Sequence, residues 1–77
     1  MSTKERINNV LKQVKPNKNL EGIDGIIEGG YLDSFELMAL ITMLSEEFDI
    51  EIDISEIIPE NFNSIDAITA MVERLAK

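Results

Sequence analysis

The feature that most constrains this chain is a set of apolar residues at helical spacing within residues 34–48. They recur three and four positions apart, so a helix would carry them along one face. They are Leu37, Leu40, Ile41, Leu44 and Phe48. Asp33 is a favourable N-cap and places Ser34 at the first helical position. The pattern therefore predicts a helix whose apolar face packs against other elements of a core.

Two further segments show the same period. Residues 3–14 predict a helix that Thr3 can cap, and Pro16 follows it as a stop signal. The last helix is expected to begin after Asn63 or Ser64, where Asn63 and Asp66 approximate a capping box. The apolar stripes of these two helices are Ile7, Val10, Leu11 and Val14 in the first, and Ile65, Ile68, Val72 and Leu75 in the second.

The remaining segments are expected to be connections. The apolar residues of segment 15–33 indicate that it folds back over the core, because a structureless loop of this length is unusual. Residues 49–54 alternate like a strand but have no second strand to pair with, so we expect an extended segment that buries Ile50, Ile52 and Ile54. Residues 55–58 predict one helical turn that ends near Pro59. The predicted fold is all-α: a single domain over residues 1–77, a small four-helix bundle of three main helices and one short helix, with a long first loop.

The composition argues against several classes of function. The 77 residues include no Cys and no His, so the thiol nucleophile, the commonest general base and the usual zinc ligands are missing. We therefore do not expect an enzyme that acts through its own side chains. No apolar run is long enough to span a membrane and no export signal opens the chain, so we expect a cytoplasmic protein.

The charge is uneven along the chain. The net charge is −8, and of the 15 acidic residues only Glu5 precedes residue 19. Most basic residues lie in that first segment, namely Lys4, Arg6, Lys12, Lys15 and Lys18. An acidic surface repels nucleic acid and anionic membranes and attracts basic protein patches, although acidity also serves solubility alone. We expect a monomer with protein partners.

The most informative stretch is residues 29–35, which read Gly-Gly-Tyr-Leu-Asp-Ser-Phe. The two glycines permit a tight turn, and Ser34 would be exposed at the positive end of a helix. Free backbone N–H groups there would stabilise an anion attached to the serine. An Asp-Ser pair is also ordinary at a helix start, so the pair alone leaves both interpretations open.

In its wider context the sequence resembles the acyl carrier protein family, including its peptidyl and D-alanyl carrier relatives. The resemblance covers roughly residues 3–75 and rests first on Leu32-Asp33-Ser34-Phe35 after the glycine-rich loop. It continues through Leu40, Ile41, Leu44, Glu46-Glu47-Phe48-Asp49 and Glu51-Ile52, and resumes at Pro59-Glu60-Asn61-Phe62-Asn63-Ser64.

The resemblance implies a carrier rather than an enzyme. Ser34, within an attachment motif completed by Asp33 and Phe35, would accept 4'-phosphopantetheine from coenzyme A through a separate phosphopantetheinyl transferase. The thiol of that arm would hold acyl or aminoacyl groups as thioesters for fatty-acid, polyketide or other specialised biosynthesis. Such a protein needs no Cys or His of its own, because the cofactor supplies the thiol.

Partner recognition would then centre on the helix that begins at Ser34. Phe35, Met38 and Thr42 would form an apolar contact strip, with Glu36 and Glu46 as its acidic flank. The partners would be the transferase, a loading ligase and downstream enzymes with basic docking patches. Burial of Phe35 and Met38 beneath the preceding loop is the structural alternative.

Two departures from fatty-acid carriers concern that same helix. Phe35 stands where Leu is usual, and Ala39 and Ser45 are uncharged where those carriers tend to place acids. These differences favour a free-standing carrier loaded by an adenylating ligase with an acid or an amino acid. If the bundle shelters an apolar cargo, the candidate lining residues are Met38, Met43, Ile57, Ile58 and Met71.

A function of another class stays open: an unmodified acidic helical adaptor that binds a basic protein. It accounts for the acidity but not for the glycine-rich loop that ends in an exposed serine. Residues 49–60 imitate a calcium loop, but Ile54 stands where the turn requires Gly, so we expect no EF-hand metal site.

Overall fold

The computed structural model describes residues 2–76, and all regular secondary structure within them is helical. In chain order the elements are α1 (Thr3–Val14), α2 (Ser34–Phe48), the 3₁₀-helix η1 (Ile54–Glu56), α3 (Pro59–Phe62) and α4 (Ile65–Leu75). The predicted all-α bundle of three main helices and one short helix is therefore confirmed. No helix in the described part of the chain is long and apolar enough to cross a bilayer.

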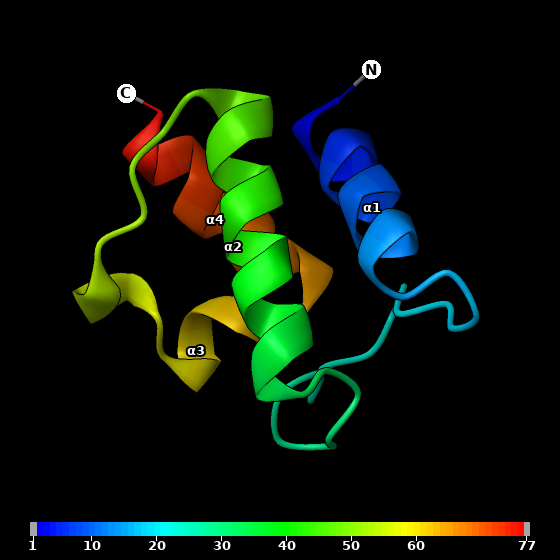
Figure 1. Ribbon diagram of the computed structural model, residues 1–77. Coiled ribbons are helices and arrows are strands. Elements are labelled where there is room, and N and C mark those ends of the chain that lie inside the picture. The colour runs from blue at the N-terminus through cyan, green and yellow to red at the C-terminus, as the bar shows by residue number, and fades with distance from the viewer. Residues whose placement is uncertain (1, 77) are drawn as a thin grey trace.

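The other two long helices, α2 and α4, both pack against α1. The short α3 packs on α4. In Figure 1, α1 runs downward and α2 runs back upward beside it, so the two helices are antiparallel. The start of α2 lies at the end of the bundle where the long first loop turns, opposite the end where both chain termini lie (Figure 1).

The helix starts follow local capping chemistry. Asp33 caps α2 as predicted, and Ser34 is its first residue. The expectation for α1 was wrong by one residue, because Ser2 is the N-cap and Thr3 lies inside the helix. The Ser2 Oγ accepts the Glu5 N–H at 3.1 Å, and Glu5 accepts the Ser2 N–H in return at 2.9 Å. Thr3 cannot form this reciprocal box, because Arg6 stands where the acid is needed.

The long first loop is part of the core, as its apolar residues predicted. Leu20, Ile26 and Leu32 are each at most 6% exposed and join the buried residues of the helices. The remaining buried side chains are Ile7, Val10, Leu11, Leu40, Ile41, Leu44, Phe62, Ile65, Ile68, Met71 and Val72. Of the predicted stripe residues, Val14, Leu37, Phe48 and Leu75 are only partly buried and pack on the edge of this core.

Asn63 fixes the loop to the rest of the bundle. Its backbone oxygen accepts the Ile26 N–H at 2.8 Å, and its side-chain oxygen accepts the N–H groups of Ile27 and Glu28 at 3.0 and 3.2 Å. The predicted capping box of Asn63 with Asp66 is therefore wrong. Ser64 caps α4 instead, through its Oγ and the N–H of Ala67.

The segment between α2 and α3 departs from its prediction at one residue. Ile50 and Ile52 are partly buried, but Ile54 is 83% exposed. The reason is that Asp53 accepts the N–H and the hydroxyl of Ser55, which starts η1 and turns the chain outward. The helical turn accordingly spans Ile54–Glu56, and Pro59 begins α3 rather than ending a turn.

Candidate functional site

The start of α2 presents Ser34 to solvent. Asp33 and Glu36 form a reciprocal capping box: Asp33 Oδ1 accepts the Glu36 N–H at 2.7 Å, and Glu36 Oε1 accepts the Asp33 N–H at 3.0 Å. Leu32, just before the cap, is buried and anchors the chain at this point. Ser34 is exposed on the first turn, where the N–H groups of Ser34 and Phe35 find no acceptor among the described residues. The positive end of α2 is thus available to an anion.

The hydroxyl of Ser34 differs from those of the other serines. Ser2 and Ser64 use their Oγ atoms to cap α1 and α4. Ser45 donates to the Ile41 carbonyl, and Ser55 donates to Asp53. Among the serines within residues 2–76, Ser34 alone makes no hydrogen bond through its side chain, so its hydroxyl is available for chemistry.

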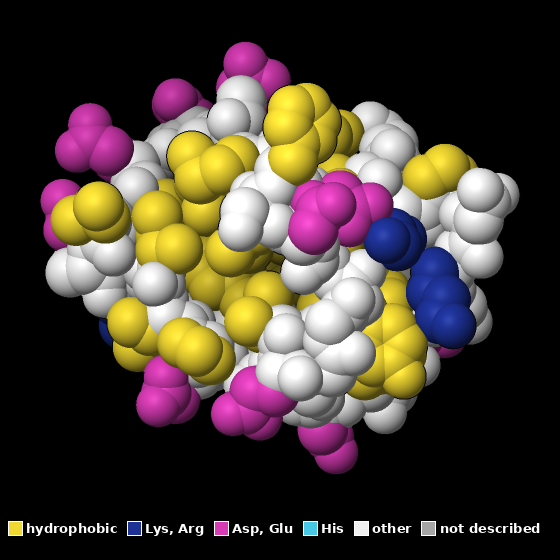
Figure 2. Space-filling view, turned by 60° about the horizontal axis from the view of Figure 1, so that its bottom comes forward, with side chains coloured by type: hydrophobic (Ala, Val, Ile, Leu, Met, Phe, Trp, Pro, Cys, Tyr) yellow, Lys and Arg dark blue, Asp and Glu magenta, His cyan; other side chains and the backbone are white. Residues whose placement is uncertain are grey.

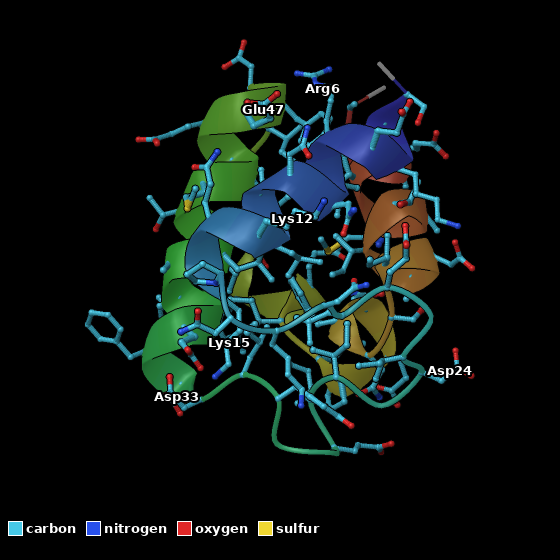
Figure 3. All side chains as sticks on the ribbon, turned by 90° about the vertical axis from the view of Figure 1, so that its right-hand side faces the viewer. Arg6, Lys12, Lys15, Asp24, Asp33 and Glu47 are labelled. Carbon is cyan, nitrogen blue, oxygen red and sulfur yellow. The ribbon has the colours of Figure 1, made fainter. Side chains whose placement is uncertain are left out.

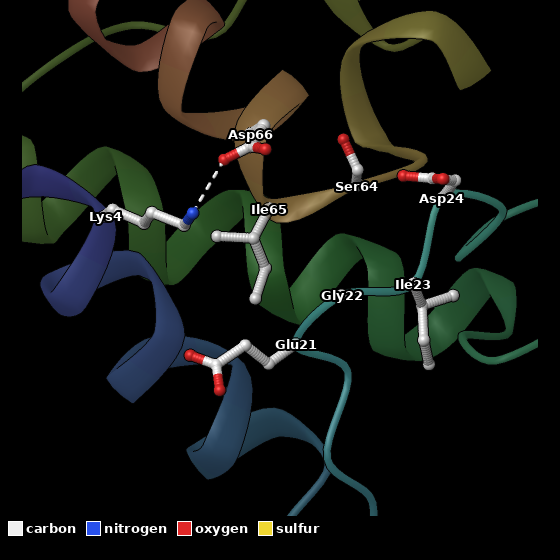
Figure 4. A pocket seen from close by; sticks show the side chains of 8 residues that line it. All are labelled: Lys4, Glu21, Gly22, Ile23, Asp24, Ser64, Ile65 and Asp66. Carbon is white, nitrogen blue, oxygen red and sulfur yellow. Dashed lines mark ion pairs between the residues drawn. The ribbon is translucent and has the colours of Figure 1, made fainter.

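Ser64 illustrates the contrast because it also lies at a helix start. It lines a hollow of about 70 Å³ at the beginning of α4, close to an ion pair between Lys4 and Asp66 (Figure 4). Its Oγ accepts the Ala67 N–H at 3.0 Å and the residue is half-buried. Ser64 is the N-cap residue, so its hydroxyl is used to cap the helix. Ser34 lies one residue after the N-cap, so its hydroxyl is not used in this way.

The glycine pair before α2 is required by the backbone. Gly30 has a φ of +75°, in the left-handed region that favours glycine. A Cβ on Gly29 would lie 2.7 Å from the Gly25 carbonyl oxygen and 2.8 Å from the ring of Tyr31. These two positions allow the loop to turn tightly into the cap of α2.

The predicted contact strip lies on the surface. Phe35 is 83% exposed and Met38 is 57% exposed, so burial beneath the loop is excluded for both side chains. Thr42 is exposed one turn further on, and its hydroxyl donates to the Met38 carbonyl at 3.0 Å. Glu46 is exposed near the far end of α2, beside a shallow groove between α1 and α2.

Glu36 is less accessible to a partner protein than Glu46, the other acid of the predicted flank. Its carboxylate is partly buried and binds Lys15 through both oxygens, at 3.0 and 2.9 Å. The Asp33 N–H, followed by Lys15, holds the pKa of Glu36 below its ordinary value of 4.5. Figure 3 shows Lys15 at the end of α1, on the side where Asp33 begins α2.

Lys15 is a residue of this site that the sequence did not single out. Twenty-one positions separate it from Glu36, and nothing in the local pattern distinguishes it from Lys12 or Lys18. Its place at the C-cap of α1 brings it to the start of α2. The one feature of the sequence that indicated a role for Lys15 is the charge distribution. Lys15 and Lys18 belong to the basic first segment of an otherwise acidic chain.

An apolar cavity of about 60 Å³ opens near this end of the bundle. It is lined by Ile27, Leu37, Ile57, Ile58, Pro59 and Phe62. Of the residues predicted to line a cargo cavity, Ile57 and Ile58 do so, whereas Met38 is exposed, Met43 lines the groove beside Glu46, and Met71 is buried in the core. Figure 2 shows hydrophobic side chains gathered around a hollow on this face.

A metal site is not evident at either end of α2. Within residues 2–76, no group of three or more acidic side chains is arranged to hold a metal ion. The site therefore consists of an uncommitted hydroxyl, two unpaired N–H groups, an ion pair and an apolar strip.

A family model described as "Phosphopantetheine attachment site" matches residues 26–72, which is more than half of the chain and includes the start of α2. A comparison with curated proteins finds no match.

Proposed function

Because the chain belongs to the phosphopantetheine attachment site family, it carries covalent 4'-phosphopantetheine, and we propose that Ser34 is the residue that holds this group. The observation that carries the proposal is the free hydroxyl of Ser34, since the other serines within residues 2–76 use theirs in hydrogen bonds. The matched segment also contains Ser45, Ser55 and Ser64, but their hydroxyls are committed to the fold.

The surroundings of Ser34 fit a phosphodiester. That group carries one negative charge, and the first turn of α2 offers unpaired N–H groups and the positive end of the helix dipole. Ser34 is exposed, so a bulky group attached to its Oγ meets no wall of the bundle. Asp33 fixes this turn by capping α2, and Leu32 fixes it by packing into the core.

The transfer step requires a separate enzyme. The Ser34 Oγ forms a bond to the pantetheine-bearing phosphorus of coenzyme A while the bond from that phosphorus to the bridging oxygen breaks. Adenosine bisphosphate leaves, and the hydroxyl proton passes to a base of the transferase, because this chain has no His and no Cys near Ser34. The attached arm supplies a thiol that holds a substrate as a thioester.

The protein is accordingly a carrier domain rather than a catalytic domain. We propose that its cargo is a short acyl or an aminoacyl group loaded by an adenylating ligase. The cavity of about 60 Å³ beside α2 supports a short or exposed cargo, because a long fatty acyl chain would need a larger enclosed space. Identification of the thioester on protein isolated from its own cells distinguishes acyl from aminoacyl cargo.

Partner enzymes would dock on the exposed strip of α2. Phe35 and Met38 offer the kind of accessible apolar anchor that dominates protein interfaces. Thr42 and Glu46 extend the strip toward the far end of the helix. Glu46 carries charge that would steer basic docking patches, whereas Glu36 is already paired with Lys15.

The test is an intact-mass measurement with coenzyme A, Mg²⁺ and a broad-specificity phosphopantetheinyl transferase. The native chain should gain one phosphopantetheine, Ser34→Ala should gain none, and Ser55→Ala should gain one as the native chain does. Ser55 is a matched control because it is an exposed serine inside the matched segment. Uptake by Ser34→Ala would refute the assignment, because the group would then be attached to another residue. No uptake by a folded and previously unmodified native chain would also refute it and would favour an unmodified adaptor.

A further inference from the structure

Two lysines from outside α2 gather beside the attachment turn. Lys15 closes α1 and binds Glu36, whose Oε1 atom also accepts the Asp33 N–H. One carboxylate oxygen therefore connects the Lys15 ammonium to the residue that precedes Ser34. Lys18 lies over the ring of Tyr31, with its Nζ 5.4 Å from the ring centroid.

These lysines line a shallow hollow of about 390 Å³ together with Gly29, Gly30 and Tyr31. Gly29, Gly30 and Tyr31 directly precede Leu32 and Asp33, the two residues that lead into Ser34. Lys18 forms no ion pair with any residue in the described part of the chain, so its charge is available to a ligand. The space-filling view shows Lys and Arg side chains gathered on one side of this face, next to an acidic group (Figure 2).

The first turn of α2 carries negative charge that nearby lysines can offset. Asp33 and Glu36 place two carboxylates at the first turn of α2, and a phosphodiester on Ser34 would add a third negative charge. Like charges this close repel one another, and the repulsion is only partly screened at the surface of a protein. Lys15 offsets the charge of Glu36, and Lys18 is the other cation that lines the hollow.

We propose that Lys15 and Lys18 form a cationic rim that accepts phosphate-ester charge at Ser34. The inference rests on the proposed attachment at this serine. Its ligand is a phosphate ester, which comes either from the tethered arm after transfer or from free coenzyme A during transfer. Lys15 and Lys18 act as positioning residues, because neither takes part in the bond-forming step.

Binding of the phosphate ester of the attached arm is tested by comparing the stability of the protein before and after modification. Urea unfolding is measured for both forms of the wild type, Lys18→Gln and Lys15→Gln, with Lys12→Gln as the control of equal charge change one turn further from the site. At low salt, modification should destabilise Lys18→Gln relative to the wild type by about threefold in the unfolding equilibrium constant. The difference should shrink at high salt, and Lys12→Gln should respond to modification as the wild type does.

Binding of the phosphates of free coenzyme A is tested in the transfer reaction. Lys18→Gln should raise the KM for coenzyme A by about two- to threefold, with an unchanged kcat, if the rim binds the phosphates of the incoming molecule. Lys15→Arg should restore what Lys15→Gln loses, because it keeps the charge. Lys18→Gln leaves the ion pair with Glu36 intact, so the test does not depend on the folding of the Lys15 variants.

Either response, specific to Lys18 and Lys15 and screened by salt, supports the rim and identifies its ligand. Equal responses of Lys12→Gln and Lys18→Gln, or no response in either assay, would overturn it. A wild-type chain that gains no phosphopantetheine overturns the proposed function and this inference with it. Intact mass, recorded on every sample, separates that failure from a failure of the rim alone.

Discussion

Replacement of Asn63 by Ala should destabilise the protein by releasing the long first loop. The Asn63 side-chain oxygen accepts two backbone N–H groups, from Ile27 at 3.0 Å and from Glu28 at 3.2 Å. Ile27 is partly buried, so water does not fully replace the hydrogen bond that its N–H loses in the variant. At a net 0.5–1.5 kcal/mol for each hydrogen bond, the expected loss is about 2 kcal/mol in the free energy of unfolding.

The loss is measurable because the domain is small. For a chain of this size it corresponds to a decrease in Tm of about 8–16 °C. Thermal and urea unfolding report the total effect, and amide hydrogen exchange locates it. The amides of Ile26, Ile27 and Glu28 should exchange faster in Asn63→Ala, while the amides of α4 away from its start should change only with the global stability.

Two further variants isolate the cause. Asn63→Asp keeps an acceptor for both N–H groups and should retain most of the stability at neutral pH. Asn17→Ala removes an exposed asparagine from the turn after α1 and should cost less than about 0.5 kcal/mol. If Asn63→Ala loses no more stability than Asn17→Ala, or if loop exchange is unchanged, the reasoning that this one side chain fixes the loop is wrong.

The remaining predictions concern two long-range contacts. Arg74 holds the pKa of Glu56 below its ordinary value of 4.5, so the unfolded state binds more protons and the pair stabilises the fold above that pH. The Tm difference between wild type and Glu56→Gln should therefore be present at pH 7 and vanish as the pH falls below 4.5 through the folded pKa; a constant difference would contradict it. Arg6→Gln should cost about 1 kcal/mol, measured by urea unfolding, because Arg6 binds both the carboxylate and the carbonyl of Glu47 and lies 4.4 Å from the ring centroid of Phe48. Arg6→Lys should recover only part of this loss, and full recovery would show that charge alone matters.

The start of α2 could be predicted because its determinants are neighbours in the chain. Asp33 and Glu36 are three residues apart, so the cap and the position of Ser34 follow from the local sequence. The exposure of Phe35 and Met38 follows in the same way from their position away from the apolar stripe. The Ser2 and Glu5 pair at the start of α1 is equally local, because these residues are also three positions apart.

Two errors occur where a hydrogen bond of a polar side chain decides the local structure. Asn63 was expected to cap α4, yet its oxygen binds the loop because Ser64 is available as the cap. Ile54 was expected to be buried by alternation, yet Asp53 turns the chain at that point. Both outcomes depend on hydrogen bonds between side chains and the backbone, which a hydrophobic pattern does not describe.

The sequence by itself determined the helices, their apolar faces and the serine at the first turn of α2, because these depend on residues within about four positions of one another. Only the tertiary structure decided that Lys15 meets Glu36, that Asn63 fixes the loop and that Arg6 binds the end of α2. Those contacts join residues that are 21, 36 and 41 positions apart. Each depends on how the helices pack, and packing also brings Lys15 to the Glu36 carboxylate at the start of α2, the helix on which the local sequence exposes Ser34.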